Sequence, residues 1–142
     1  MKLDILAFAA HPDDIELACS GTLIKQVKNG NKVGIIDLTE GELGSRGSRE
    51  LRYEEAENAS KVIGNSIREN LNLGDGFFEI NEQSLLRVVE MIRKYQPEIV
   101  LCNAIKDRHP DHGRGGELVK RASFLAGLVK IETSLNGEKQ EK

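Results

Sequence analysis

Residues 3–16 read Leu-Asp-Ile-Leu-Ala-Phe-Ala-Ala-His-Pro-Asp-Asp-Ile-Glu, an apolar run followed at once by a cluster of ionisable side chains. The short, almost continuously apolar part is typical of a central strand in a parallel sheet that is covered on both faces. In open α/β sheets, ligands bind outside the carboxyl ends of the strands. The stretch therefore predicts an α/β fold whose chemistry lies at residues 11–16.

Outward from this stretch, short apolar runs alternate with segments of helical periodicity. The further strands are expected at residues 32–38, 67–73 and 98–102, and the helices at 14–29, 49–64, 82–96 and 114–131. The connections are too long for hairpins, so the strands are expected to be parallel and joined by right-handed crossovers. The pattern predicts a Rossmann-like, doubly wound, mostly parallel sheet with helices on both faces. Charges inside residues 67–73 place that strand at the edge of the sheet.

The fourth expected strand opens into a second polar cluster, residues 103–113, which contains His109, Asp111 and His112. In the commonest strand orders of doubly wound sheets, the first and fourth strands are neighbours at the point where the order reverses. The second cluster and residues 11–16 are therefore expected to face one cleft. All three histidines of the chain lie in these two clusters.

The length of 142 residues suits one domain, which we expect to cover residues 1–133, with a flexible, charged tail at 134–142. A net charge of -3 gives no basic excess, which argues against nucleic acid or an anionic membrane surface as a partner. No apolar run approaches the roughly 18 residues of a membrane span. Cys19 and Cys102 stand far apart in apolar surroundings and are expected to be buried thiols. Together these features predict a cytoplasmic protein.

Three residues of the two clusters form a complete ligand set for a catalytic metal. His11, Asp14 and His112 supply two imidazoles and a carboxylate and leave a position open for water. Zinc is the default ion, one per chain, and another divalent transition metal would suit the same ligands. Adjacent aspartates cannot easily point at one ion, so Asp13 stays free to accept a proton from a water that attacks a carbonyl.

The second cluster supplies further candidates. His109, as a cation, could stabilise an oxyanion or protonate a leaving amine. Asp111 could orient His109. A single His-Pro-Asp tripeptide is more often an ordinary turn with a helix-capping aspartate. Two such motifs at equivalent strand ends favour a metal site.

The loop at residues 39–48 contains three glycines and several charges, a composition that favours a functional role. Glu42, Arg46 and Arg52 lie in this loop or just after it. They could bind a polar or anionic substrate, or they could belong to a solvated loop and helix face. The sequence leaves both interpretations open.

In combination, four motifs resemble a known family. They are Ala-Ala-His-Pro-Asp-Asp at 9–14, Gly-Glu-Leu-Gly at 41–44, Arg52-x-x-Glu55 and His109-Pro-Asp-His112. With them the chain resembles the PIG-L/LmbE family of zinc-dependent N-acetylglucosamine deacetylases. The resemblance implies that His11, Asp14 and His112 are zinc ligands. It also implies that Asp13 is the general base and that His109 is the electrostatic partner. Arg52 would, by the same resemblance, lie near the sugar or its acidic aglycone.

Longer runs at 3–14, 37–44 and 93–104 are similar to the bacillithiol-biosynthesis branch of that family. This similarity implies hydrolysis of the acetamide of N-acetylglucosaminyl malate, with another N-acetylglucosaminyl conjugate as the alternative substrate. Members of the family usually continue with further strands, so we expect this chain to be truncated at its C-terminal end. The open sheet edge then favours self-association into a homo-oligomer.

Three other classes of protein share part of the pattern. A non-catalytic, receiver-like module would gather Asp13, Asp14 and Asp75 around Mg²⁺, but the histidines suit zinc or iron better. A non-haem iron oxygenase also uses two histidines and a carboxylate, on folds expected to be rich in β-strands. The glycines of residues 113–116 could bind a nucleotide phosphate at a helix start, although this pattern alone is weak.

Overall fold

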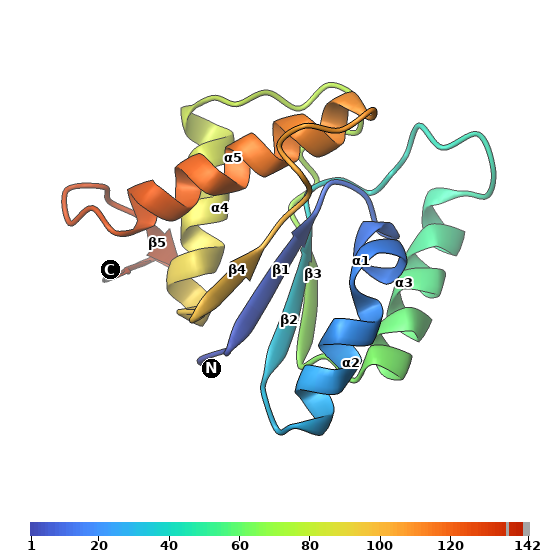
Figure 1. Cartoon of the computed structure of the whole chain (residues 1–142). Helices are drawn as coiled ribbons and strands as arrows, with labels where there is room; N and C mark the ends of the chain where they lie inside the picture. The colour runs from blue at the N-terminus through green and yellow to red at the C-terminus, as the bar shows by residue number, and fades with distance from the viewer. Residues whose placement is uncertain (136, 141–142) are drawn as a thin grey trace.

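The computed structural model describes residues 1–135 and 137–140. One parallel sheet has the strand order β3-β2-β1-β4 (Figure 1). Its strands are β1 (Ile5–Ala9), β2 (Val33–Asp37), β3 (Ile67–Asn70) and β4 (Ile99–Leu101). The helices are α1 (Asp14–Ala18), α2 (Ser20–Lys28), α3 (Arg49–Ile63), α4 (Glu82–Tyr95) and α5 (Pro110–Ala126). This arrangement confirms the predicted α/β fold, with β1 beside β4 and β3 at an edge.

Every residue of β1 is buried, and its side chains alternate between two apolar cores. Leu6 and Phe8 face the core that α4 and α5 cover. Ile5, Ala7 and Ala9 face the core on the side of α1, α2 and α3. Figure 1 shows the two helical layers on opposite faces of the sheet. Because both faces are covered, the strand must be apolar throughout, which explains its unbroken apolar sequence.

The expected single helix at 14–29 is divided into α1 and α2. Cys19 interrupts it, with φ -143° and ψ 12°. The hydroxyl of Ser20 donates to the carbonyl of Glu16 at 2.8 Å, a side-chain bond that competes with the helical ladder at this point. Leu17, which lies in α1 just before the break, is 83% exposed.

The last helix begins earlier and ends earlier than the expected range of 114–131. His109 caps it, because its Nδ1 accepts the backbone N–H of Asp111 at 3.2 Å. Pro110 occupies the first helical position, where its missing N–H and fixed φ are favourable. The chain after the helix is fastened to α4 by Arg93, which donates to the carbonyls of Ala126, Leu128 and Ile131 and to the hydroxyl of Thr133.

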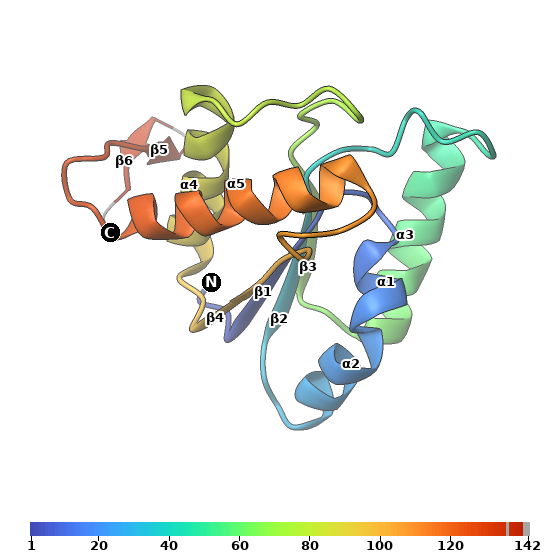
Figure 2. The same ribbon diagram turned by 45° about the horizontal axis from the view of Figure 1, so that its top comes forward.

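The C-terminal segment differs from the expected flexible tail. β5 (Ser134–Leu135) and β6 (Glu138–Lys139) pair in an antiparallel hairpin beside α4 (Figure 2). The remaining part of the expected tail, residues 136 and 141–142, lies outside the described residues. Cys19 is half-buried and Cys102 is exposed, so the expectation of two buried thiols is wrong for Cys102. Within the described ranges, no helix has both the length and the apolar character needed to cross a membrane.

Candidate metal centre

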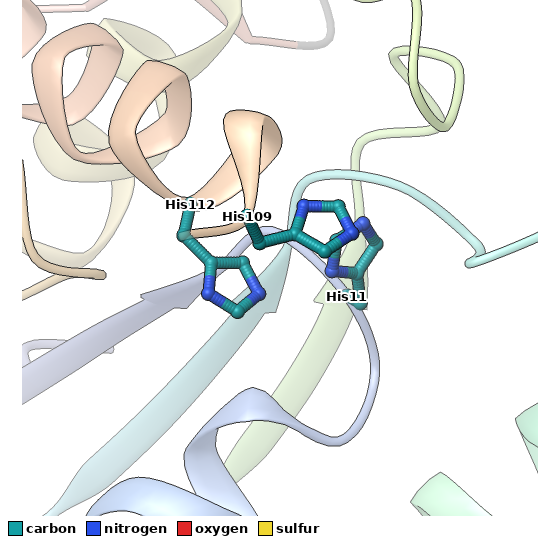
Figure 3. Close-up of side chains that lie close together, drawn as sticks. All are labelled: His11, His109 and His112. Atoms are coloured by element: carbon teal, nitrogen blue, oxygen red, sulfur yellow. The ribbon is translucent and has the colours of Figure 1, made fainter. Parts of the chain in front are cut away.

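The two polar clusters meet because β1 and β4 are hydrogen-bonded neighbours with Ala7 opposite Leu101. Beyond the strands, the backbone N–H of Ala10 donates to Oδ1 of Asn103 at 2.9 Å, which keeps the two loops together. The three imidazole rings gather where the loop after β1 meets the first turn of α5 (Figure 3). Their ring centroids lie 4.8 Å (His11–His109), 5.4 Å (His11–His112) and 4.7 Å (His109–His112) apart.

The carboxylate of Asp14 lies between two of these rings. Its Oδ1 is 3.1 Å from Nε2 of His112, and its Oδ2 is 3.7 Å from Nδ1 of His11. Oδ2 also accepts the backbone N–H of His11 and the side-chain amide of Asn103, each at 3.0 Å. Two ring nitrogens and a carboxylate therefore converge from the end of β1, from α1 and from α5.

Carboxylates also hold the opposite ring nitrogens. Nε2 of His11 lies 3.0 Å from Oδ1 of Asp75 and 3.2 Å from Oδ2 of Asp111. Nδ1 of His112 lies 3.3 Å from Oδ2 of Asp107. Metal-binding histidines commonly donate their second nitrogen to a carboxylate, which fixes the tautomer and the ring orientation. The donor set thus fits a zinc-type ion, with Nδ1 of His11 and Nε2 of His112 turned toward Asp14.

Among the described residues, two groups of three possible ligand atoms lie within 4.8 Å of one another, and neither group contains Asp14. One consists of His11, His109 and His112, and the other of His11, Asp75 and Asp111. In the second group the carboxylates already have other partners. Asp75 accepts the N–H of Leu43 at 2.9 Å, and Asp111 accepts the N–H of Gly76 at 2.8 Å. We therefore assign Asp75 and Asp111 to orienting His11.

The electrostatics of the centre favour a positive charge. Burial alone would lower the pKa of His11, but the carboxylates of Asp14, Asp75 and Asp111 outweigh it and raise this pKa to about 9. Burial alone would raise the pKa of Asp14, but hydrogen bonds from His11 and Asn103 lower it to about 2. Surroundings that hold a proton on a buried imidazole this strongly also attract a metal cation.

Asp13 stands apart from the convergent ligands. Its side chain is 55% exposed, and its Oδ2 lies 3.4 Å from Nη2 of Arg52. Pro12, Asp13, Arg46, Arg52 and Glu55 are among the residues that line a groove at this point. Arg46 and Arg52 thus share a groove with the candidate base, as a role in substrate binding requires.

Glu42 and Asp111 are placed differently from what was expected. Glu42 faces the interior of the loops, where its Oε1 accepts the backbone N–H of Asp75 at 2.9 Å. The carboxylate of Asp111 contacts His11, and only its backbone N–H reaches His109. Asp111 therefore contacts His109 through its backbone and His11 through its side chain.

The sequence analysis did not assign Asp75, Asn103 or Asp107 to orienting the residues of the metal centre. Asp75 was considered only as a ligand of Mg²⁺ in the rival receiver-like interpretation. A signal for it exists, because Gly74 and Gly76 flank it with φ values of +97° and +72°. Backbone of this kind is adopted at low cost only by glycine, so the two glycines permit the turn that carries Asp75. Asn103 and Asp107 had no comparable signal beyond their place in the second polar cluster.

Comparison with known proteins gives a consistent result. The family model described as PIG-L: GlcNAc-PI de-N-acetylase matches residues 6–123. Diacetylchitobiose deacetylase of Thermococcus kodakarensis is 30% identical over 140 residues, covering 92% of this chain and 52% of the relative. The uncharacterized deacetylase YaiS of Escherichia coli is 34% identical over 114 residues, covering 76% of this chain and 61% of the relative. The 4-oxalmesaconate hydratase of Pseudomonas putida is 26% identical over 134 residues, covering 85% of this chain and 52% of the relative.

A solved structure has the same architecture over nearly the whole chain. The crystal structure of the conserved protein TT1542 from Thermus thermophilus superposes with a TM-score of 0.89 at 39% identity. The match covers 98% of this chain and 63% of that one. The chain thus spans between half and two thirds of the length of these relatives.

Proposed function

Because the chain belongs to the PIG-L family, whose model is described as GlcNAc-PI de-N-acetylase, we propose that it is part of a metal-dependent hydrolase. This hydrolase removes the acetyl group from an N-acetylglucosamine conjugate. One observation carries the proposal. Asp14 lies between Nδ1 of His11 and Nε2 of His112, while Asp13 remains free at the edge of the same centre.

In this proposal His11, Asp14 and His112 hold one zinc ion. Imidazole nitrogen and carboxylate oxygen are usual ligands of catalytic zinc, and three protein ligands leave a coordination position open. When bound, the ion would polarise the acetamide carbonyl and lower the pKa of water. His109, the third ring of the cluster, is exposed, and we assign it to proton transfer.

The remaining residues carry the protons. Asp13 accepts a proton as the oxygen of water bonds to the acetamide carbon. The carbon–nitrogen bond then breaks, and His109 gives a proton to the leaving nitrogen, so that the products are acetate and a free amine. The proton that Asp13 collects balances the one that His109 gives. The stacking of His109 on His112, with centroids 4.7 Å apart, supports a position beside the reacting group.

The groove beside Asp13 suggests the kind of conjugate. Arg46 and Arg52 line it, and guanidinium groups bind carboxylates and phosphates well. We therefore propose an anionic aglycone, of which N-acetylglucosaminyl malate, the bacillithiol precursor, is one example. Another N-acetylglucosaminyl conjugate with an acidic group is the alternative.

Acetate release from zinc-loaded protein tests the proposal. The substrates are N-acetylglucosaminyl malate, diacetylchitobiose and free N-acetylglucosamine, and we expect the highest kcat/KM with the malate conjugate. Preference for a neutral substrate would overturn the anionic aglycone alone. Failure to release acetate from any of the three would contradict deacetylation. Hydration of 4-oxalmesaconate should be measured in parallel, since one relative is named for it.

A further inference from the structure

Residues 41–44, Gly-Glu-Leu-Gly, form a tight turn just beyond β2. The backbone N–H of Gly44 donates to the carbonyl of Gly41 at 3.1 Å, and Gly41 has φ +63°. The turn is anchored at its start by buried Thr39, whose hydroxyl accepts the N–H of Gly41 at 3.2 Å and donates to the carbonyl of Ala10 at 2.8 Å. The turn is therefore attached to the residue that precedes His11.

On one side the turn packs against the guanidinium of Arg52. A Cβ atom at Gly41 would lie 2.7 Å from Cζ of Arg52, and one at Gly44 would lie 2.9 Å from its Nη1. A side chain at either position would therefore require the guanidinium, which is the far end of a flexible side chain, to move from the place it occupies. The guanidinium held in this way has its Nη2 3.4 Å from Oδ2 of Asp13.

On the other side the turn holds Asp75 through two reciprocal hydrogen bonds. Oε1 of Glu42 accepts the N–H of Asp75, and the N–H of Leu43 donates to Oδ2 of Asp75, each at 2.9 Å. The remaining oxygen, Oδ1, then faces Nε2 of His11 at 3.0 Å. Asp75 is only 8% exposed, so this pair of bonds determines which oxygen reaches the ring.

We propose that the 41–44 turn is a positioning element that fixes two contacts at the same time. One is the contact of Arg52 with Asp13, and the other is the contact of Asp75 with His11. One backbone unit then fixes both the carboxylate that accepts the proton and the ring that holds the metal. Glu42 acts through Asp75 and is a positioning residue, not a substrate-binding one. The role assigned to Asp13 rests on the proposed function, whereas the role assigned to His11 requires only that metal binds.

The test compares glycine-to-alanine variants matched for backbone strain. Gly41→Ala places a side chain at φ +63° and against Arg52. Gly64→Ala, at the end of α3, places one at φ +79° with Val27 Cγ1 at 3.2 Å, away from the site. Gly44→Ala introduces the contact with Arg52 without a positive φ, and it serves if Gly41→Ala does not fold. Zinc affinity is measured by competition with a chromophoric chelator, and kcat and KM are measured by acetate release.

The two contacts are separated by Arg52→Lys and Asp75→Asn. We expect Arg52→Lys to lower kcat roughly tenfold or more with unchanged zinc affinity, because the guanidinium nitrogen that lies 3.4 Å from Asp13 is lost. We expect Asp75→Asn to weaken zinc binding about 10- to 100-fold, the usual effect of removing a carboxylate behind a ligating histidine. Gly41→Ala should show both effects, and Gly64→Ala neither.

A Gly41→Ala protein that matches Gly64→Ala in both zinc affinity and kcat would overturn the proposal, as would unchanged zinc affinity in Asp75→Asn. If the wild-type protein releases no acetate, the proposed function fails, but the zinc affinities still decide the His11 contact. In that case a crystal structure of Gly41→Ala decides the other contact. Arg52 displaced from Asp13 supports the proposal, and Arg52 still in contact with Asp13 contradicts it.

Discussion

Nε2 of His112 lies 3.1 Å from Oδ1 of Asp14, although Asp14 begins α1 and His112 lies in the first turn of α5. The contact joins helices from opposite faces of the sheet at the carboxyl ends of β1 and β4. A ligand set of this kind cannot form unless the sheet has its native strand order. Metal binding by these residues would therefore require the native strand order.

Loss of any one proposed ligand should abolish stoichiometric zinc. We expect His11→Ala, Asp14→Ala and His112→Ala to bind little metal after dialysis, because a site with three protein ligands has none to spare. His109→Ala is the matched control, since it removes the third ring of the cluster and should keep zinc while losing turnover. Metal content is measured by elemental analysis. Loss of zinc in His109→Ala would shift the assignment toward the three-histidine set, and one equivalent of zinc in His112→Ala would shift it toward His11, Asp75 and Asp111.

Asp13→Asn should retain zinc and lose about 10²- to 10⁴-fold in kcat, the usual contribution of a general base. The amide keeps the shape and exposure of the side chain but cannot accept the proton. The control is Glu50→Gln, an exposed acid-to-amide change in the first turn of α3, which should leave kcat within about twofold. Activity of zinc-loaded Asp13→Asn close to that of the wild type would assign the base to another group.

The metal-free protein should lose stability as the pH rises from about 6.5 to about 9. The folded pKa of His11 is about 9 against an ordinary value of 6.5, so the native state binds more protons than the unfolded chain in this window. The stabilisation is complete below pH 6.5 and lost above pH 9, with an upper limit of about 3 kcal/mol. Urea unfolding in the presence of a chelator measures it. His11→Asn should remove this slope, and an equal slope in that variant would assign the proton elsewhere.

Arg68→Met should destabilise the fold by about 3–5 kcal/mol, because it leaves a buried carboxylate unpaired. Arg68 donates to both oxygens of Asp37, at 2.7 and 3.0 Å, and it also pairs with Glu16. Its side chain is only 5% exposed. Lys120→Met, which breaks an exposed pair with Glu117, is the control and should cost less than about 1 kcal/mol.

Combining Arg68→Met with Asp37→Leu should recover part of the lost free energy of unfolding, since the carboxylate that Arg68→Met leaves unpaired is then removed. Equal unfolding midpoints in urea for Arg68→Met and Lys120→Met would show that the buried pair contributes no more than a surface one.

The sequence was sufficient to predict the fold class, because β1 and β2 are apolar runs of strand length and the intervening segments have helical spacing. The convergence of His11, Asp14 and His112 followed from topology alone, through the pairing of β1 with β4. The break at Cys19 was not predictable from periodicity, since the apolar spacing continues through it.

The partners of the site residues were harder to predict than the residues themselves. Asp111 lies two positions from His109, and proximity in sequence suggested a contact between them. The α5 helix begins at Pro110, which turns the Asp111 side chain toward His11 instead. Asp75 reaches His11 only because the turn at 41–44 and two glycines direct it there, and no local pattern shows such a long-range contact.

The central position of β1 also determines how the site opens. Its residues pair with β2 on one side and, over part of their length, with β4 on the other, so their amide protons should exchange only when the whole domain unfolds. Residues 45–50, by contrast, are exposed along their whole length, and their amides should exchange through local opening at a small cost in free energy. His11 is thus attached to a strand whose amides should exchange slowly, while the groove beside Asp13 borders a segment whose amides should exchange quickly. In the proposed function, a substrate would then enter and leave through the labile side while the strand that carries His11 stays folded.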